Sequence, residues 1–153
     1  METIKQIAPY LPYDLGIKIL NYKSDYVGIE YSTIIGFYYV KNIPHFAYFG
    51  GSTGKSIGEC KFIMRPLSDL TKPCLEDGKI PLEELAVHLF DREMRDYFYN
   101  NVPKGSVNGI PFWVSQKLFE WHFDMFNLIE EGIAIDVNTV DINTLNYIQH
   151  END

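Results

Sequence analysis

The sequence feature that most constrains this fold is a run of β-branched and aromatic residues at positions 33–40, TIIGFYYV. Side chains of this kind favour extended strands. The next four residues, Lys41-Asn42-Ile43-Pro44, have the composition of a turn, and residues 45–49 alternate as a second strand. We therefore predict a β-hairpin over residues 33–49, with Gly36 at a position suited to a β-bulge.

Three more strands are predicted before residue 66. In residues 15–22, Leu15, Ile17 and Ile19 share one face, although the alternation is weak. Residues 26–31 are again β-branched and aromatic, and residues 59–65 form a strand that Pro66 ends. Together these segments predict a mostly antiparallel, aromatic-rich sheet over residues 15–65.

The second half of the chain has helical patterns. Pro81 suits the first position of a helix, with an apolar stripe behind it, and residues 67–71 form a single turn. Asparagine, proline and glycine between residues 96 and 108 predict a loop. Residues 4–13, interrupted by prolines, are a short helical or irregular segment. After residue 132 we expect a strand at 133–137 and a last helical turn at 143–148.

The clearest helix is predicted at residues 114–131. Ser115 is a candidate cap, and Gly132 is a natural stop. Between them, apolar residues recur at spacings of three and four: Leu118, Phe119, His122, Met125, Phe126 and Ile129. We predict that this long C-terminal helix packs on the sheet, so that the chain is one α+β domain spanning residues 1–153.

Composition places the chain among ordinary globular proteins. Of its 153 residues, 46% are hydrophobic and 22% are charged, a balance that argues against disorder. The start has no apolar signal segment, and no apolar run has the length of a membrane span. The two cysteines do not form a disulfide framework. We therefore expect a cytoplasmic protein without a membrane partner.

The net charge of −8 is unevenly distributed. Residues 118–153 contain eight acidic residues and neither lysine nor arginine. Such a region repels phosphate backbones and attracts basic protein surfaces, although a solvated face is the simpler interpretation. The candidate binding residues are Glu120, Asp124, Glu130, Glu131, Asp136 and Asp141.

Two motifs suggest catalysis or cofactors without meeting the requirements. Residues 50–56, GGSTGKS, resemble a phosphate loop, but only three residues separate Gly50 from Gly54, one fewer than that motif needs. Asp124, Asp136 and Asp141 would bind Mg²⁺ if the fold brought them together, whereas capping and turn roles are the more common use of such residues. We assign no metal ligand, no cofactor and no catalytic residue, and enzymatic activity stays an open alternative.

Aromatic residues mixed with lysines in the first half suggest a second kind of surface. Tyr38 and Tyr48, with Lys41 and Lys55, would suit a face on which single-stranded nucleic acid stacks. Residues 1–75 carry eight basic and six acidic side chains, which is a weak electrostatic signal for that function. Ordinary packing within a sheet also explains the aromatic residues.

Several segments resemble known sequences. Residues 7–13 (IAPYLPY) and 65–70 (RPLSDL) resemble small uncharacterised proteins encoded by phages, prophages and mobile elements of Bacteroidetes. Residues 119–126 (FEWHFDMF) and 128–136 (LIEEGIAID) resemble the C-terminal part of the same proteins. The resemblance implies a phage-related origin and a bacterial cytoplasm, and it carries no assigned activity.

These observations predict an accessory protein that binds an unidentified protein through its acidic C-terminal surface. The first alternative is a binder of single-stranded nucleic acid, and the second is a metal-dependent enzyme with a carboxylate cluster. Self-association is compatible with each of the three.

Overall fold

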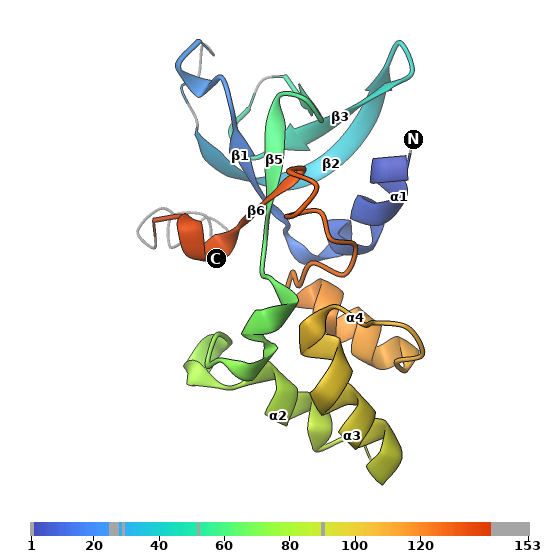
Figure 1. The fold of residues 1–153 in the computed structure, drawn as a ribbon. Coiled ribbons are helices and arrows are strands. Elements are labelled where there is room, and N and C mark those ends of the chain that lie inside the picture. The colour runs from blue at the N-terminus through green and yellow to red at the C-terminus, as the bar shows by residue number, and fades with distance from the viewer. Residues whose placement is uncertain (1, 25–27, 29, 52, 90, 142–153) are drawn as a thin grey trace.

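The structure is a computed structural model that describes residues 2–24, 28, 30–51, 53–89 and 91–141 (Figure 1). Its strands are β1 (Gly16–Ile19), β2 (Tyr31–Val40), β3 (Ile43–Tyr48), β4 (Lys55–Ser56), β5 (Cys60–Met64) and β6 (Ala134–Asp136). Its α-helices are α1 (Glu2–Ile7), α2 (Pro81–Ala86), α3 (Arg92–Asn101) and α4 (Phe112–Glu120). Short 3-10 helices are η1 (Ala8–Tyr13), η2 (Tyr22–Ser24), η3 (Leu67–Thr71), η4 (Glu76–Gly78), η5 (Val102–Lys104) and η6 (Val137–Thr139). The predicted α+β class is confirmed.

The strands form one sheet in the order β4-β3-β2-β1-β5-β6. Every neighbouring pair from β4 to β5 is antiparallel, as predicted, but β6 runs parallel to β5. The sheet is therefore mixed. Helices α2, α3 and α4 lie between β5 and β6 in the chain, and a long crossover of this kind is what a parallel neighbour requires.

The sheet is curled, and β2 is the strand that bends. Its first residues pair with β1, whereas Ile34 to Val40 pair with β3. The register shifts between Ile34 and Gly36, so the predicted bulge is present. Phe46 on β3 and Phe62 on β5 have ring centroids 5.1 Å apart, although three strand spacings of a flat sheet would separate them by about 14 Å. This contact closes the curl around a core.

The core of the curled sheet is built from the face predicted for the first strand. Leu15, Ile17 and Ile19 are fully buried, while Lys18 between them is half-buried. Tyr10 from η1 and Leu128 from the C-terminal part complete this core. The strands predicted at residues 15–22, 33–49 and 59–65 are thus confirmed, with trimmed ends. Of the strand predicted at 26–31, residues 26, 27 and 29 lie outside the described residues, Gly28 and Glu30 are not in a strand, and Tyr31 begins β2.

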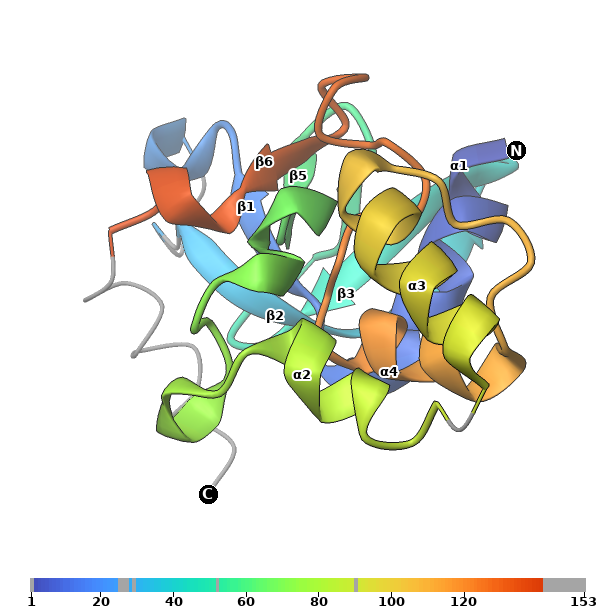
Figure 2. The same cartoon turned by 60° about the horizontal axis from the view of Figure 1, so that its bottom comes forward.

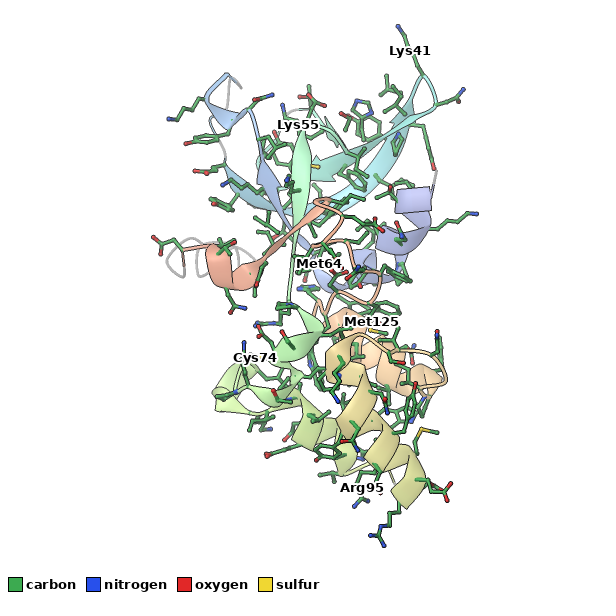
Figure 3. The ribbon with its side chains drawn as sticks, in the orientation of Figure 1. Lys41, Lys55, Met64, Cys74, Arg95 and Met125 are labelled. Atoms are coloured by element: carbon green, nitrogen blue, oxygen red, sulfur yellow. The ribbon has the colours of Figure 1, made fainter. Side chains whose placement is uncertain are left out.

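Helices α2, α3 and α4, with η3 and η5, form a second half of the molecule, which has its own hydrophobic core (Figure 1). We call it the helical half. Figure 2 shows α2, α3 and α4 grouped in front of the sheet. Phe119 and Phe126 pack against both cores, and Met64 and Met125 lie where the two halves meet (Figure 3). No helix among the described residues is long and apolar enough to cross a membrane.

The loop predicted at residues 96–108 is wrong for its first part, because α3 extends from Arg92 to Asn101. Asp91 caps this helix by accepting a hydrogen bond from the Met94 backbone N–H at 2.9 Å. Phe98 anchors it in the helical core. The asparagines and Pro103 therefore mark the end of a helix rather than a whole loop. The helix predicted to start at Pro81 is confirmed as α2.

The long C-terminal helix is also wrong. Helix α4 begins after Pro111, without a cap from Ser115, and ends at Glu120. His122 then takes a positive φ of 58°, which breaks helical geometry. Leu118 and Phe119 of the predicted apolar stripe lie in α4, whereas its later members lie in the turns that follow, where Phe123 and Leu128 are the fully buried residues. The strand predicted at 133–137 is confirmed as β6, and the turn predicted at 143–148 lies outside the described residues.

Candidate functional site: the β2–β3 hairpin

Residues 121–129, which we call the junction, connect the helical half to the sheet and contain the most chemically suggestive side chains. Tyr10 holds the junction to η1. Its hydroxyl donates to the Phe123 carbonyl at 2.8 Å and accepts from the Met125 backbone N–H at 2.9 Å. Burial raises the pKa of Tyr10 well above its usual value. This tyrosine is a neutral structural link rather than an acid or a nucleophile.

Asp124 organises the turn that follows. Its side chain is buried, and its carboxylate accepts backbone hydrogen bonds from Leu128 at 2.9 Å, Ile129 at 2.8 Å and Phe126 at 3.3 Å. Charge-assisted bonds of this kind are the stronger class of protein hydrogen bond. Asp124 is predicted from the sequence to bind a partner, but its carboxylate instead accepts hydrogen bonds from backbone N–H groups of the turn inside the molecule.

His122 makes the third polar contact of the junction. Its ring Nε2 donates to the carbonyl of Tyr13. Burial is the main cause that lowers the pKa of His122, and this keeps the ring neutral around pH 7. The backbone on each side of Phe123 pairs with Arg65: the Arg65 backbone N–H donates to the His122 carbonyl at 2.8 Å, and the Arg65 carbonyl accepts from the Asp124 N–H at 2.8 Å. His122 thus works as a backbone anchor.

The other predicted acidic residues do not converge. Glu120 accepts from Lys117 at 2.8 Å, Glu130 accepts from the Asn127 amide at 2.6 Å, and Asp136 accepts from the Asn138 backbone at 2.9 Å. Glu131 and Asp141 are exposed. Within the part of the chain that the structure describes, no three histidine, cysteine, aspartate or glutamate side chains are grouped to hold a metal ion.

A cavity of about 280 Å³ lies beside the junction. Leu67 and Pro103 supply apolar walls, and Lys104, Glu130 and Asp124 supply charge of both signs. The Asp124 carboxylate is already bonded to backbone, and the volume lies at the lower end of the roughly 300–1,000 Å³ of typical ligand sites. The cavity is therefore a weaker candidate for the functional site than the exposed surface of the β2–β3 hairpin.

The β2–β3 hairpin exposes an unusual amount of apolar surface. Of eleven large hydrophobic side chains exposed among the described residues, seven lie on this hairpin or directly after it. They are Ile35, Phe37, Tyr38, Tyr39, Val40, Ile43 and Phe49, and we call this set the hairpin surface. Its most exposed members are Ile35 at 67% and Tyr39 at 54%.

The register of the hairpin distributes these side chains over two faces. Phe37 lies opposite Phe46, so it extends the core face of the sheet toward the tip, and Tyr39 follows on the same face. Tyr38 lies opposite His45 on the other face. The hairpin therefore presents apolar side chains on both sides, which a strand at the surface of a monomer does not usually do.

The exposed rings are held in defined positions. Phe37 and Tyr39 meet edge to face, with centroids 6.2 Å apart. Tyr38 stacks on His45 at 5.8 Å, and its hydroxyl accepts from the Gly54 backbone N–H at 2.9 Å. Side chains that are ordered before binding lose less conformational entropy when a partner arrives.

The hairpin surface is large enough for recognition. Its four aromatic side chains are 43–54% exposed, and rings of this kind have full areas of 150–250 Å², so they offer about 400 Å² together. Counted over both faces of the hairpin, that area is comparable to the largest apolar patch of a typical monomer, which is often functional. Ile35, Val40 and Ile43 add to it.

A tight turn projects the tip of the hairpin away from the body of the molecule (Figure 3). Lys41 and Asn42 both have positive φ, at 49° and 64°, and Val40 pairs directly with Ile43. These are the features of a two-residue type I′ turn, whose twist matches that of the strands. Lys41 is thereby placed at the outermost point of the hairpin (Figure 3).

The residues predicted for nucleic-acid stacking separate in the structure. Tyr38 is exposed and Lys41 lies at the tip, but Tyr48 is only 2% exposed. The Tyr48 ring is covered by Gly51, where an added Cβ would come within 2.4 Å of the ring. Lys55 is half-buried on β4 and lies near Glu59, whose pKa is lowered mainly by hydrogen bonds from Ser56 and to a smaller extent by the charge of Lys55. These four side chains do not form one stacking face.

The hairpin is predicted from the sequence, but its aromatic residues are interpreted there as packing within the sheet or, with Tyr38, as a face that stacks nucleic acid, and not as a surface that binds a protein. The overlooked signal was a missing alternation: Phe37 and Tyr39 on one face and Tyr38 and Val40 on the other are all large and apolar. A strand with one solvated face normally alternates with polar residues. A strand that is apolar on both faces must be buried on both faces or must bind something.

Comparison with known proteins gives no match: no protein-family model, curated protein or solved structure is significantly similar to the chain.

Proposed function

We propose that this chain is a protein-binding module and that the hairpin surface is the part that contacts the partner. The observation that carries the proposal is the grouping of seven exposed, large apolar side chains on one projecting hairpin. Large apolar side chains that are exposed together on one element of a protein surface mark interaction sites. Aromatic side chains in particular are enriched at the energetic centres of protein interfaces.

The chemistry of the hairpin favours a protein over a nucleic acid. Between residues 31 and 49, Lys41 is the one lysine or arginine, and there is no acidic residue. Binding to a phosphate backbone depends on several cationic side chains, each of which releases counterions. An uncharged aromatic surface instead fits the apolar core of a protein–protein interface.

The further attributes predicted from the sequence stay predictions. A phage-related accessory role in a bacterial cytoplasm is compatible with a small binding module. Binding through the acidic residues would have to use the half-buried Asp136 and the exposed residues Glu120, Glu130, Glu131 and Asp141, because Asp124 is buried. The hairpin surface is the more specific candidate because its side chains lie next to one another.

Site-specific photo-crosslinking tests the proposal. A photoreactive phenylalanine analogue replaces Tyr39, which is 54% exposed on the hairpin surface. The matched control places the same analogue at Phe112, which is 75% exposed on the helical half. Each tagged protein is irradiated in a nuclease-treated lysate of native host cells, and adducts are identified by mass spectrometry.

We expect a defined protein adduct from position 39 and none of comparable yield from position 112. Adducts of equal yield from both positions, or no adduct from position 39, would contradict the proposal. An adduct from position 39 that consists of nucleic acid, recovered when nuclease is omitted, would favour the alternative instead.

A further inference from the structure

The outer half of β2 has no strand partner on one side. β1 pairs with β2 only at Tyr31, Ser32 and Thr33. Beyond Ile34, β2 pairs with β3 alone among the described residues. Helix α1 lies beside this part of the hairpin (Figure 1), but it supplies no strand. The segment from Ile35 to Val40 is therefore a sheet edge, which we call the β2 edge.

The opposite edge of the hairpin is protected in two ways. β4 covers β3 at His45 and Phe46. Pro44, close to the tip, has no backbone N–H to offer a further strand. Short covering strands and prolines are standard means by which proteins prevent edge-to-edge association.

Among the described residues, the β2 edge has neither a covering strand nor a proline, although a bulge lies at its inner end between Ile34 and Gly36 and helix α1 lies beside it (Figure 1). Residues 35–40, IGFYYV, contain no charged residue and no proline, and five of the six are β-branched or aromatic. A segment of this composition on an open edge is a template for pairing with another strand. The difference between the two edges indicates that the β2 edge is covered when the protein functions.

We propose that a second copy of this chain covers the β2 edge, by antiparallel pairing of β2 with β2 across a two-fold axis. This inference rests on the proposed function, because it names the partner that the hairpin surface binds. The edge requires an extended, uncharged strand of β-branched and aromatic residues with one open side. β2 is itself such a strand, and every copy carries it.

Two-fold symmetry also suits the side chains of the hairpin. Paired residues of antiparallel strands lie on the same face, and an axis perpendicular to the sheet preserves those faces. Phe37 and Tyr39 of one copy therefore lie beside Phe37 and Tyr39 of the other, and the Tyr38 side chains meet on the opposite face. A standard interface buries about 800 Å² per partner, and the exposed parts of the Phe37, Tyr38 and Tyr39 rings supply about a third of that.

Sedimentation equilibrium of the purified full chain over a concentration series tests this pairing. The interface variants are Ile35→Lys and Tyr39→Lys, since charges on an edge prevent strand addition. The matched control is Val87→Lys, at a position that is 72% exposed on α2's C-terminal side. Circular dichroism confirms that each variant remains folded.

We expect twice the chain mass for the natural sequence and for Val87→Lys, with the single-chain mass for both interface variants. A dimer that persists in both interface variants would place the contact elsewhere and overturn the inference. A natural chain that is monomeric throughout would also overturn it. If the chain is monomeric, a crosslinked adduct of position 39 with a different protein would still support the proposed function. The absence of any such adduct would contradict both the proposed function and the pairing of two copies.

Discussion

The residue types of the junction and of the hairpin suggest roles opposite to those that the structure gives them. The junction contains a histidine, an aspartate and a tyrosine contact, the usual components of a reactive site, yet each polar group bonds to backbone inside the fold. The hairpin contains aromatic and β-branched residues, the usual components of a core, yet it leaves them exposed. Reactive residue types here hold the structure together, and core residue types are available for binding.

The difference reflects how each segment provides hydrogen-bond partners for its backbone N–H and carbonyl groups. The junction is irregular, so its N–H groups need the Asp124 carboxylate and the Tyr10 hydroxyl as partners. The hairpin is regular, so β2 and β3 satisfy one another and their side chains are free of that task. The predictions below test this contrast.

The largest expected effect belongs to Asp124. Replacement by alanine leaves one buried and two partly buried backbone donors without their charged acceptor, and we expect the free energy of unfolding to fall by about 3 kcal/mol. Urea denaturation at fixed protein concentration measures it. The control is Glu120→Ala, an exposed residue whose loss costs about 0.5 kcal/mol or less. Equal effects from the two substitutions would show that Asp124 does not organise the junction.

Tyr10→Phe is the next test of the junction. The ring and its packing remain, but the Phe123 carbonyl and the Met125 N–H both lose a buried partner. We expect the free energy of unfolding to fall by about 2 kcal/mol. Tyr97→Phe, which removes an exposed hydroxyl bonded to the Asn108 carbonyl, is the matched control. A Tyr10→Phe protein as stable as the natural chain would contradict the structural role of the hydroxyl.

The junction also predicts a pH dependence. The pKa of His122 is lower in the folded protein than its usual 6.5, so the unfolded chain binds the proton more readily. Stability is therefore retained above about pH 6.5 and lost as the pH falls toward the folded pKa, by about 1 kcal/mol between pH 7 and 6 at most. Asparagine does not titrate and tolerates the positive φ of this position. The variant His122→Asn should therefore lose this pH-dependent part of the free energy of unfolding, measured by urea titration at each pH. An unchanged pH profile in that variant would exclude His122 as its source.

The smallest expected effect lies at the tip of the hairpin. Lys41 and Asn42 both adopt positive φ, and Asn-Gly is the favoured pair for such a turn. The double variant Lys41→Asn, Asn42→Gly should raise the free energy of unfolding by about 1 kcal/mol. Thermal unfolding measures the gain. A loss of stability would mean that the turn is not of the proposed type.

Local patterns predicted the local parts of the fold. The strands at residues 15–22, 33–49 and 59–65 and the start of α2 follow from β-branched residues, turn residues and Pro81. The length of α4 could not be predicted, because it depends on contacts of residues 122–125 with Tyr10 and Tyr13, more than one hundred residues away. The exposure of the hairpin depends on where β1 stops pairing with β2, which no local pattern encodes.

Hydrogen exchange read by mass spectrometry tests the central claim most directly, as a function of protein concentration. If the hairpin surface pairs with a second copy, the amides of residues 35–40 become more protected as the concentration rises, while those of β5 stay constant. Protection of residues 35–40 that is independent of concentration, in the purified chain and after addition of any captured partner, would contradict the account.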